Sequence, residues 1–363
     1  MNKKGFTLVE LLAVIAILAI LIIIALPNVL KMLNDAKKNS FLTEAKTVYS
    51  EVSKKYISES MKGNKLSYVS SEDDTKLEIT GRDLQYCVFL NTDGTIKKMQ
   101  VSNREYVVEL SGNKNISDLN INDLKDGNLD DEECGPNASI SFEDDSWKII
   151  SDHVKSGKTK YYNVGDQKQV TIDGIDYTVR IANKSTPDVC NTEEFSQTAC
   201  GFVVEFVDVV EDNVGFNFLN KGEVNWKDSD LRGYVNNEFF NKLPTDLQDS
   251  IIETKVISGH GTNDESDFET TDKVYLLSTK EVYNSDWTTA KDKQRQLDYY
   301  SLKNVSSSTN KEYVVKKYNG ENTSWWLRTK YSGYTHYMQF INNDGNATYG
   351  AGSHGISPAF RIG

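Results

Sequence analysis

The apolar and polar residues follow different patterns in successive parts of the chain, and the first part is the most distinctive. Apolar residues fill positions 6–26, with a single charge among them at Glu10. A transmembrane helix needs about 20 apolar residues, so this run is long enough to cross a bilayer. A carboxylate inside the membrane costs about 2.5–3.5 kcal/mol, so Glu10 requires a compensating positive charge.

The pattern then becomes that of an amphipathic helix. Apolar residues recur at three- and four-residue steps between Phe41 and Tyr56, and lysines lie largely on the other side. We therefore predict one long helix over residues 6–60, with Gly63 as its C-cap. Pro27 lies inside this helix and is expected to kink or locally melt it, because proline removes one backbone donor.

After the helix, segments in which apolar and polar residues alternate predict a small antiparallel sheet. Residues 86–90 and 95–101 form a predicted hairpin, because Asp93-Gly94 supplies the positive φ values that a tight turn requires. Residues 105–110 are a third predicted strand. These strands are expected to pack on the amphipathic half of the helix.

The C-terminal part of the chain shows mixed patterns. Alternation over residues 169–181, with a turn at Asp173-Gly174, predicts a second hairpin. Asp228 or Ser229 can cap a short amphipathic helix. Strands are also predicted at 201–207 and 273–278, a helix or turn follows at 279–281, and further apolar blocks lie at 324–329, 338–345 and 355–362.

These elements together predict an α+β fold. A chain of 363 residues suggests two or three domains. We divide it into a basic leader (1–5), a long helix (6–60, of which 6–26 is apolar), a small β domain (61–156) and a mixed α+β domain (157–363).

Composition restricts the classes of function that the chain can have. The net charge is −12, from 53 acidic and 41 basic residues, so the basic footprint of a nucleic-acid-binding protein is absent and no such partner is expected. Four cysteines in an exported chain are consistent with two disulfides. The sequence permits three pairings; Cys87 with Cys134 and Cys190 with Cys200 respect the predicted domain boundary.

No cofactor or metal site is predicted. The histidines of the C-terminal part do not fall at a metal-ligand spacing. Residues 118–129 carry several acidic and amide side chains, but the EF-hand template requires Gly where Asp123 stands and Glu where Leu129 stands. A polar loop with a short helix is the favoured interpretation, and calcium binding stays an alternative.

The N-terminal pattern Lys3-Lys4-Gly5-Phe6-Thr7-Leu8-Val9-Glu10 resembles the prepilin signal of type IV pilins and pseudopilins. In that family a membrane peptidase cleaves after the glycine and methylates the new N-terminal phenylalanine. The resemblance implies that cleavage follows Gly5 and that Phe6 is methylated. Glu10 would serve filament assembly by pairing with the amine of Phe6 on an adjacent subunit, and Pro27 belongs to the same assembly helix. The alternative is an ordinary secretory signal or membrane anchor, whose cleavage site would follow the apolar run.

Three blocks in the C-terminal part also form a recognisable set. They are W-x-x-S-x-L-R-x-x-x-N from Trp226, W-W-L-R at 325–328 and S-P-A-F-R-I at 357–362. Together they resemble a bacterial exported module of uncharacterised function, akin to C-type-lectin-like and formylglycine-generating-enzyme-like folds. The resemblance implies a lectin-like domain displayed outside the cell.

Trp325, Trp326 and Arg328 are the candidates for ligand contact in this module, because an indole face can stack on a sugar ring. Adjacent strand residues point to opposite faces, so at most one of the two tryptophans is expected to point into the core, and the other to face solvent or a neighbouring layer. Core and scaffold packing of the tryptophans, and pairing of the arginine with a carboxylate, are the favoured alternatives.

Catalysis is not expected. The glycine-rich residues 349–355 lack the helix-opening context and the lysine of a P-loop, and no G-x-S-x-G elbow occurs. Nothing in the sequence marks Cys190 and Cys200 as reactive. A surface-delivered enzyme on a formylglycine-generating-enzyme-like fold nevertheless stays open.

The sequence therefore predicts a type IV pilin-like filament subunit, a minor or tip pilin whose C-terminal domain serves recognition or adhesion. It would lie in the bacterial cytoplasmic membrane before assembly and at the cell surface afterwards. Its partners would be other pilin subunits, the prepilin peptidase, the assembly machinery, and a glycan or other surface ligand. The alternative is a structural major pilin, or a secretion or competence pseudopilin without a ligand.

Overall fold

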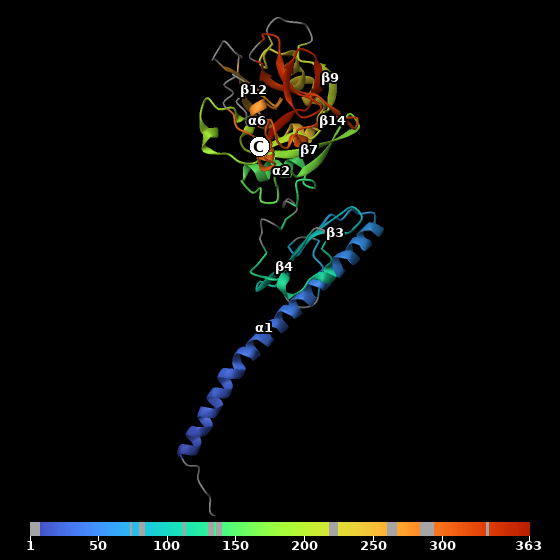
Figure 1. Ribbon diagram of the computed structural model, residues 1–363. Helices are drawn as coiled ribbons and strands as arrows, with labels where there is room; N and C mark the ends of the chain where they lie inside the picture. The colour runs from blue at the N-terminus through green and yellow to red at the C-terminus, as the bar shows by residue number, and fades with distance from the viewer. Residues whose placement is uncertain are drawn as a thin grey trace, which may run out of the picture. The chain divides into compact units, whose positions relative to one another are not determined.

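The chain forms two compact units, which we call unit 1 and unit 2 and describe separately. Unit 1 ends at Ala138 and unit 2 begins at Ser139. The computed structural model (Figure 1) describes residues 8–72, 75–79, 84–111, 114–129, 134–135, 140–217, 224–259, 267–283, 294–331 and 334–363.

The boundary between the units lies earlier than the sequence predicted. Helix α2 (Trp147–Lys155) falls in the segment assigned above to the first β domain, yet it belongs to unit 2. Trp147 and Ile150 are buried in the core of unit 2, and the Trp147 ring lies 6.3 Å from the ring of Phe360. The division therefore falls at 138/139 rather than at 156/157, because the apolar face of α2 packs on unit 2.

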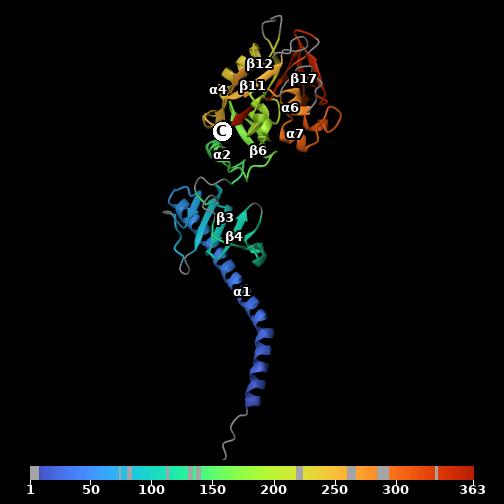
Figure 2. The ribbon, with the colours of Figure 1, turned by 90° about the vertical axis from the view of Figure 1, so that its left-hand side faces the viewer.

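Helix α1 (Leu8–Met61) is the longest element of unit 1 and is drawn in blue in Figures 1 and 2. It continues through Pro27 without a break, so the local melting expected there is not observed, and the ribbon curves instead. Gly63 has φ of 81°, and the N–H of Asn64 donates to the carbonyl of Glu59 at 3.0 Å. The predicted C-cap at Gly63 is confirmed.

The second half of α1 packs on a five-stranded antiparallel sheet in the order β1-β2-β3-β4-β5. Its buried side chains are Phe41, Leu42, Ala45, Val48 and Val52, as the three- and four-residue spacing predicted. The strands are β1 (Tyr68–Ser70), β2 (Gln85–Leu90), β3 (Ile96–Ser102), β4 (Tyr106–Ser111) and β5 (Lys125–Asp126). Short 3-10 helices follow β4 at η1 (Ile116–Asp118) and η2 (Ile121–Asp123).

The turn between β2 and β3 lies against α1. Gly94 has φ of 84°, as the predicted Asp-Gly turn requires, and the N–H of Thr95 donates to Asp93 at 2.9 Å. The ring of Tyr56 occupies the space that a side chain at position 94 would need. The hydroxyl of Tyr56 donates to the carbonyl of Thr92 at 2.7 Å, so the helix and the turn fix each other.

Unit 2 contains two larger sheets. The first has the order β10-β20-β8-β7-β6, with β13 also paired to β20. The strands are β6 (Gln167–Ile172), β7 (Ile175–Asn183), β8 (Val203–Phe206), β10 (Ile251–Ile252), β13 (Val274–Tyr275) and β20 (Ala359–Ile362). The predicted turn at Asp173-Gly174 joins β6 to β7, and both residues have positive φ.

The second sheet has the order β18-β17-β16-β19-β9, in which β16 and β19 run parallel and the other pairs are antiparallel. Its strands are β9 (Glu211–Gly215), β16 (Trp325–Lys330), β17 (Met338–Ile341), β18 (Ala347–Gly350) and β19 (Ser353–Ile356). Two hairpins complete the strands: β11 (Thr254–Gly259) with β12 (Asp267–Asp272), and β14 (Lys316–Tyr318) with β15 (Glu321–Thr323).

Short helices surround these sheets. They are η3 (Asp188–Asn191), η4 (Gln197–Ala199), α3 (Asp230–Tyr234), η5 (Val235–Phe239), α4 (Phe240–Lys242), α5 (Thr245–Gln248), α6 (Thr279–Tyr283), α7 (Asp298–Leu302) and η6 (Lys311–Tyr313). A single large core joins α2, both sheets and most of these helices, whereas Cys190 of η3 packs in a small separate cluster with Phe195 and Cys200. The fold is α+β, as predicted.

Candidate functional site

The N-terminal part of α1 is the first candidate site. It is long and apolar enough to cross a membrane, and its apolar side chains from Leu8 to Leu33 are exposed within the chain. Glu10 lies in the first turn of this helix. Gly5 and Phe6, the predicted processing residues, lie outside the described residues. A row of exposed apolar side chains of this length requires a membrane or neighbouring helices to cover it.

Trp325 and Trp326, the predicted ligand contacts, are both fully buried. The indole N–H of Trp325 donates to the carbonyl of Val314 at 3.0 Å, and that of Trp326 donates to Val214 at 2.7 Å. Trp326 also packs edge-on against Phe216, with ring centroids 5.3 Å apart. Because β16 is covered on both faces, the second tryptophan meets a neighbouring layer rather than solvent, and neither ring is accessible to a ligand.

Arg328 is also buried and pairs with Glu281 of α6. Its two terminal nitrogens lie 2.6 Å and 2.7 Å from the two carboxylate oxygens. Nη1 further donates to the carbonyl of Leu276 at 2.6 Å, and Nη2 donates to the hydroxyl of Thr198 at 2.9 Å. Arg328 therefore joins β16 to α6 and η4 and does not face a ligand, which is the pairing that the sequence favoured.

A second buried ionic cluster was not predicted from the sequence. Glu205 of β8 lies 2.9 Å from Nε of Arg180 and 3.1 Å from Nζ of Lys316, and the hydroxyl of Tyr300 donates to it at 2.9 Å. Burial alone would raise the pKa of Glu205, but the two cations bring it below its usual value. Burial lowers the pKa of Lys316 to about 8. The cluster connects the neighbouring strands β7 and β8 to α7 and β14.

The W-x-x-S-x-L-R-x-x-x-N block has a structural explanation. Asp272 of β12 accepts from the indole of Trp226 at 2.8 Å and from Nε of Arg232 at 2.7 Å. Ser229 caps α3 by accepting from the N–H of Arg232 at 3.1 Å, as predicted. The side chain of Asn236 accepts from the N–H of Lys273 at 2.8 Å. The block thus fixes α3 and η5 to the β12–β13 segment.

The cysteines form the two disulfides that respect the division into units. Cys87 is bonded to Cys134 in unit 1, and Cys190 is bonded to Cys200 in unit 2. In the described part of the chain, no group of three or more His, Cys, Asp or Glu side chains is placed to hold a metal ion. Asp123, within the loop considered for calcium, caps η2 with Asn120 and forms an ion pair with Lys114.

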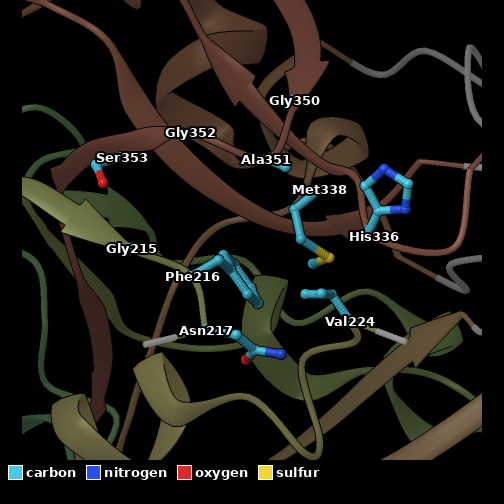
Figure 3. Close-up of a pocket in the computed structure, with 10 residues that line it drawn as sticks. All are labelled: Gly215, Phe216, Asn217, Val224, His336, Met338, Gly350, Ala351, Gly352 and Ser353. Atoms are coloured by element: carbon cyan, nitrogen blue, oxygen red, sulfur yellow. The ribbon is translucent and has the colours of Figure 1, made fainter. Parts of the chain in front are cut away.

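A pocket in unit 2 is the strongest remaining candidate for ligand binding (Figure 3). We call it the sheet-edge pocket; its volume is about 450 Å³, within the range of small-molecule sites. Figure 3 shows Phe216, Val224 and Met338 directed toward the same space. Its lining residues are Gly215, Phe216, Asn217, Val224, His336, Met338, Gly350, Ala351, Gly352 and Ser353.

Four tyrosines form a group of their own, which we call the tyrosine cluster: Tyr331, Tyr334, Tyr337 and Tyr349. Tyr349 pairs with Gln339 whereas the pocket residue Met338 pairs with Gly350, so Tyr349 lies on the opposite face of the sheet from Met338. The rings of Tyr331 and Tyr349 are stacked with centroids 3.6 Å apart, and Tyr334 lies 4.9 Å from Tyr337. The pocket residue His336 contacts the ring of Tyr337 edge-on at 4.7 Å. The sequence analysis did not single out these tyrosines, although four of them within nineteen positions were a visible signal.

Two family models match the chain, one at each end. Residues 1–26 match the model of a prokaryotic N-terminal methylation motif. The chain carries a type IV pilin-like signal. This pilin-like signal implies processing by a prepilin peptidase and assembly with other pilin-like subunits, and it fits a membrane-anchored and then surface-exposed protein.

The C-terminal match is to a domain of unknown function (DUF6273) over residues 207–363, which is less than half of the pilin-like chain. This matched segment does not include β8, although Val204 of β8 pairs with Phe360 of β20. The compact unit is therefore larger than the matched domain. No curated protein and no solved structure matches the chain significantly.

Proposed function

We propose that this chain is a minor or tip subunit of a type IV pilin-like filament that displays unit 2 as a recognition or adhesion domain. The observation that supports the proposal is the continuity of the methylation motif with α1. The first half of this helix exposes its apolar side chains, and its second half packs into unit 1. Such a helix can pass from the membrane into a filament without changing the fold of unit 1.

Assembly would use the charge at position 10. Cleavage after Gly5 creates an amine at Phe6, and in the apolar surroundings of packed helices this amine can pair with Glu10 of an adjacent subunit. Return of the helix to the membrane would reverse the process. The minor or tip position is proposed because unit 2, at residues 139–363, is larger than unit 1 and would crowd a closely packed shaft.

The mass of the mature N-terminal peptide tests the processing. The proposal expects a chain that begins at methylated Phe6; an intact leader or a cut after Leu26 would contradict it. Glu10→Leu tests assembly and should abolish filament formation. Glu51→Leu is a matched control, because Glu51 lies on the same helix beyond the apolar run and pairs with Lys54 at 2.7 Å. Equal filament yield from the two variants would overturn the proposed charge pairing.

The position in the filament has a separate test. Gold-conjugated antibodies against unit 2, viewed by electron microscopy, should label filament ends or sparse positions if the subunit is minor. Dense labelling along the whole length would instead favour the major pilin. We propose no catalytic role, and the C-type-lectin-like relation of unit 2 stays part of this proposal, supported by the three sequence blocks described above.

A further inference from the structure

The loop that the disulfide of unit 2 closes has little apolar packing of its own. We call residues 190–200 the disulfide loop. Its two cysteines and Phe195 form a small cluster that is separate from the large core of unit 2. Of the loop residues, all of which the structure describes, only Ala199 belongs to that core. A loop that buries so little apolar surface in the core gains little free energy to offset the entropy of being ordered.

The disulfide loop nevertheless completes the buried ion pair between Arg328 and Glu281. The hydroxyl of Thr198 donates to the carboxylate of Glu281 and accepts from Nη2 of Arg328 at 2.9 Å. Thr198 is fully buried, and neither charged side chain has exposed surface. A buried ion pair is stable only when further hydrogen bonds satisfy its remaining polar atoms. Thr198 supplies one such bond to each ion.

Two further contacts set the position of Thr198. Its hydroxyl lies 2.8 Å from Oγ of Ser196, which accepts from the N–H of Ile257 at 3.2 Å. Its carbonyl accepts from the hydroxyl of Tyr275 at 3.2 Å. All four residues are buried. These bonds exist only when η4 lies in one place, so a displaced η4 would leave several buried polar groups without partners.

The position of Thr198 depends on the closure of the loop. Cys200 lies two residues after Thr198 and is bonded to Cys190, ten positions earlier in the chain. Without this bond, the loop would have to give up its conformational freedom for polar contacts that water can also supply. We therefore expect the open loop to leave the ion pair and to admit water to it.

We propose that formation of the Cys190–Cys200 disulfide closes unit 2 around the Arg328–Glu281 pair. In the oxidised chain Thr198 bonds to both ions, and in the reduced chain the loop leaves them open to water. The two thiols lose two electrons and two protons, which a second disulfide accepts as it is reduced to two thiols. Such an exchange proceeds in an oxidising compartment, so unit 2 would reach its final form only outside the cytoplasm.

Native-state hydrogen exchange of the full processed chain tests this closure, followed by mass spectrometry of peptic fragments. The open-loop variant carries Cys190→Ser with Cys200→Ser. The matched control carries Cys87→Ser with Cys134→Ser, which removes the disulfide of unit 1 instead. Two amides report on the ion pair, because the N–H of Ile257 donates to Ser196 and that of Ser278 donates to Glu281 at 2.8 Å.

In the open-loop variant, the amides of Ile257 and Ser278 should exchange at least about tenfold faster than in the control, at a rate that low urea does not change. The amide of Phe206 provides the reference, because it donates to the carbonyl of Pro358 at 3.0 Å inside the first sheet. It should still exchange through unfolding of unit 2, at a rate that rises with urea. This difference separates a local opening from a general loss of stability.

Thr198→Val removes the hydroxyl and keeps both the disulfide and the approximate shape of the side chain. It should speed exchange at Ser278, and Thr198→Ser should restore the original rate. Thr192→Val is the matched control, since Thr192 is an exposed residue of the same loop whose hydroxyl donates to the carbonyl of Val189. Adding Thr198→Val to the open-loop variant should change the rate by less than about twofold, because the contact is already lost.

The inference is overturned if the open-loop variant and the control exchange alike at Ile257 and Ser278. It is also overturned if exchange there rises with urea together with that of Phe206, or if Thr198→Val and the paired replacement multiply each other's effects. Refolding of the unchanged chain provides a second check: dithiothreitol should give the fast pattern, and oxidised glutathione should return the slow one. None of these measurements depends on filaments, so a negative result leaves the proposed pilin-like function intact.

Discussion

Arg328 and Glu281 form a two-point ion pair with no exposed surface on either side chain, at N–O distances of 2.6 Å and 2.7 Å. The pair joins a strand in the middle of one sheet to a short helix 47 positions earlier in the chain. Because both charges are removed from water, each depends on the other for its stability.

Glu281→Gln should therefore destabilise unit 2 by about 3–5 kcal/mol, because it leaves the Arg328 charge buried without its counter-charge. All five tryptophans of the chain follow Ser139, so tryptophan fluorescence during urea unfolding reports unit 2 alone. Glu238→Gln, at an exposed position, should change stability by less than about 0.5 kcal/mol. The double variant Arg328→Met with Glu281→Leu should recover much of the loss; a double variant no better than Glu281→Gln would contradict the assignment.

Substitutions within the Glu205 cluster should lower the free energy of unfolding by unequal amounts. Glu205→Gln should cost about 3–5 kcal/mol, because Arg180 and Lys316 would both lose their counter-charge. Lys316→Met should cost clearly less, since burial already disfavours the charge of Lys316 and lowers its pKa to about 8. Urea unfolding of the two variants by tryptophan fluorescence gives the comparison. Equal losses would show that Lys316 carries as much of the cluster as Glu205.

Acid should destabilise unit 2 through His354. Burial lowers the pKa of this ring from 6.5 to about 4, so the unfolded chain binds the proton more readily than the folded chain. The contribution of His354 is complete above pH 6.5 and is lost as the pH falls toward 4. The loss should be about 2 kcal/mol, less than the full shift implies, because the ring is partly open to solvent.

His354→Gln should flatten this part of the stability–pH profile, measured by urea unfolding at a series of pH values. His336→Gln, which alters an exposed ring, should leave the slope in place. A profile that keeps its full slope in His354→Gln would assign the acid sensitivity to another group.

Two glycines of unit 1 have nearly the same backbone conformation but different surroundings, so they separate backbone strain from steric overlap. Gly63 and Gly94 have φ of 81° and 84°, but a Cβ at position 63 meets nothing within 4 Å, whereas one at position 94 overlaps the ring of Tyr56. Gly63→Ala should cost about 1 kcal/mol through its φ alone, and Gly94→Ala should cost more. Hydrogen exchange of the β2 and β3 amides measures the difference. Tyr56→Ala combined with Gly94→Ala should return the cost toward that of Gly63→Ala; no such recovery would rule out the overlap as the cause.

The two disulfides should stabilise separate units. They close loops with sequence separations of 47 and 10. The chain-entropy relation gives about 4 kcal/mol for the longer loop and about 3 kcal/mol for the shorter one. Paired Cys→Ser replacement at positions 87 and 134 should weaken exchange protection in unit 1 and leave the tryptophan transition unchanged. Replacement at 190 and 200 should do the reverse, and a shift of both units by either change would contradict the separation.

Local chemistry made parts of this fold predictable. The apolar run and the three- and four-residue spacing that follows it located α1, and Gly63 located its end. Asp93-Gly94 and Asp173-Gly174 located two hairpins, and Ser229 located the start of α3. Each of these depends on a few neighbouring residues whose conformational preferences are strong.

The candidate site was less predictable, because it depends on tertiary contacts. The period of two suggested that Trp325 and Trp326 face different surroundings, which is true, but the sequence could not show that both faces of β16 are covered. The partner of Arg328 and the three partners of Glu205 come from distant segments. The sheet-edge pocket likewise requires β9 to reach β19, which pairs in parallel with β16.

The bond between Cys87 and Cys134 determines how the chain responds when unit 2 is pulled. A tensile load entering at Ser139 reaches Cys134 almost at once and passes through the sulfur atoms into β2. The intervening residues, which include β3, β4 and β5, lie outside this load path. Without the bond, unfolding of these residues would lengthen the chain by about 150 Å, at 3.3–3.6 Å per residue. With the bond, this lengthening is prevented, and the sheet of unit 1 stays folded under a load that would otherwise unfold it.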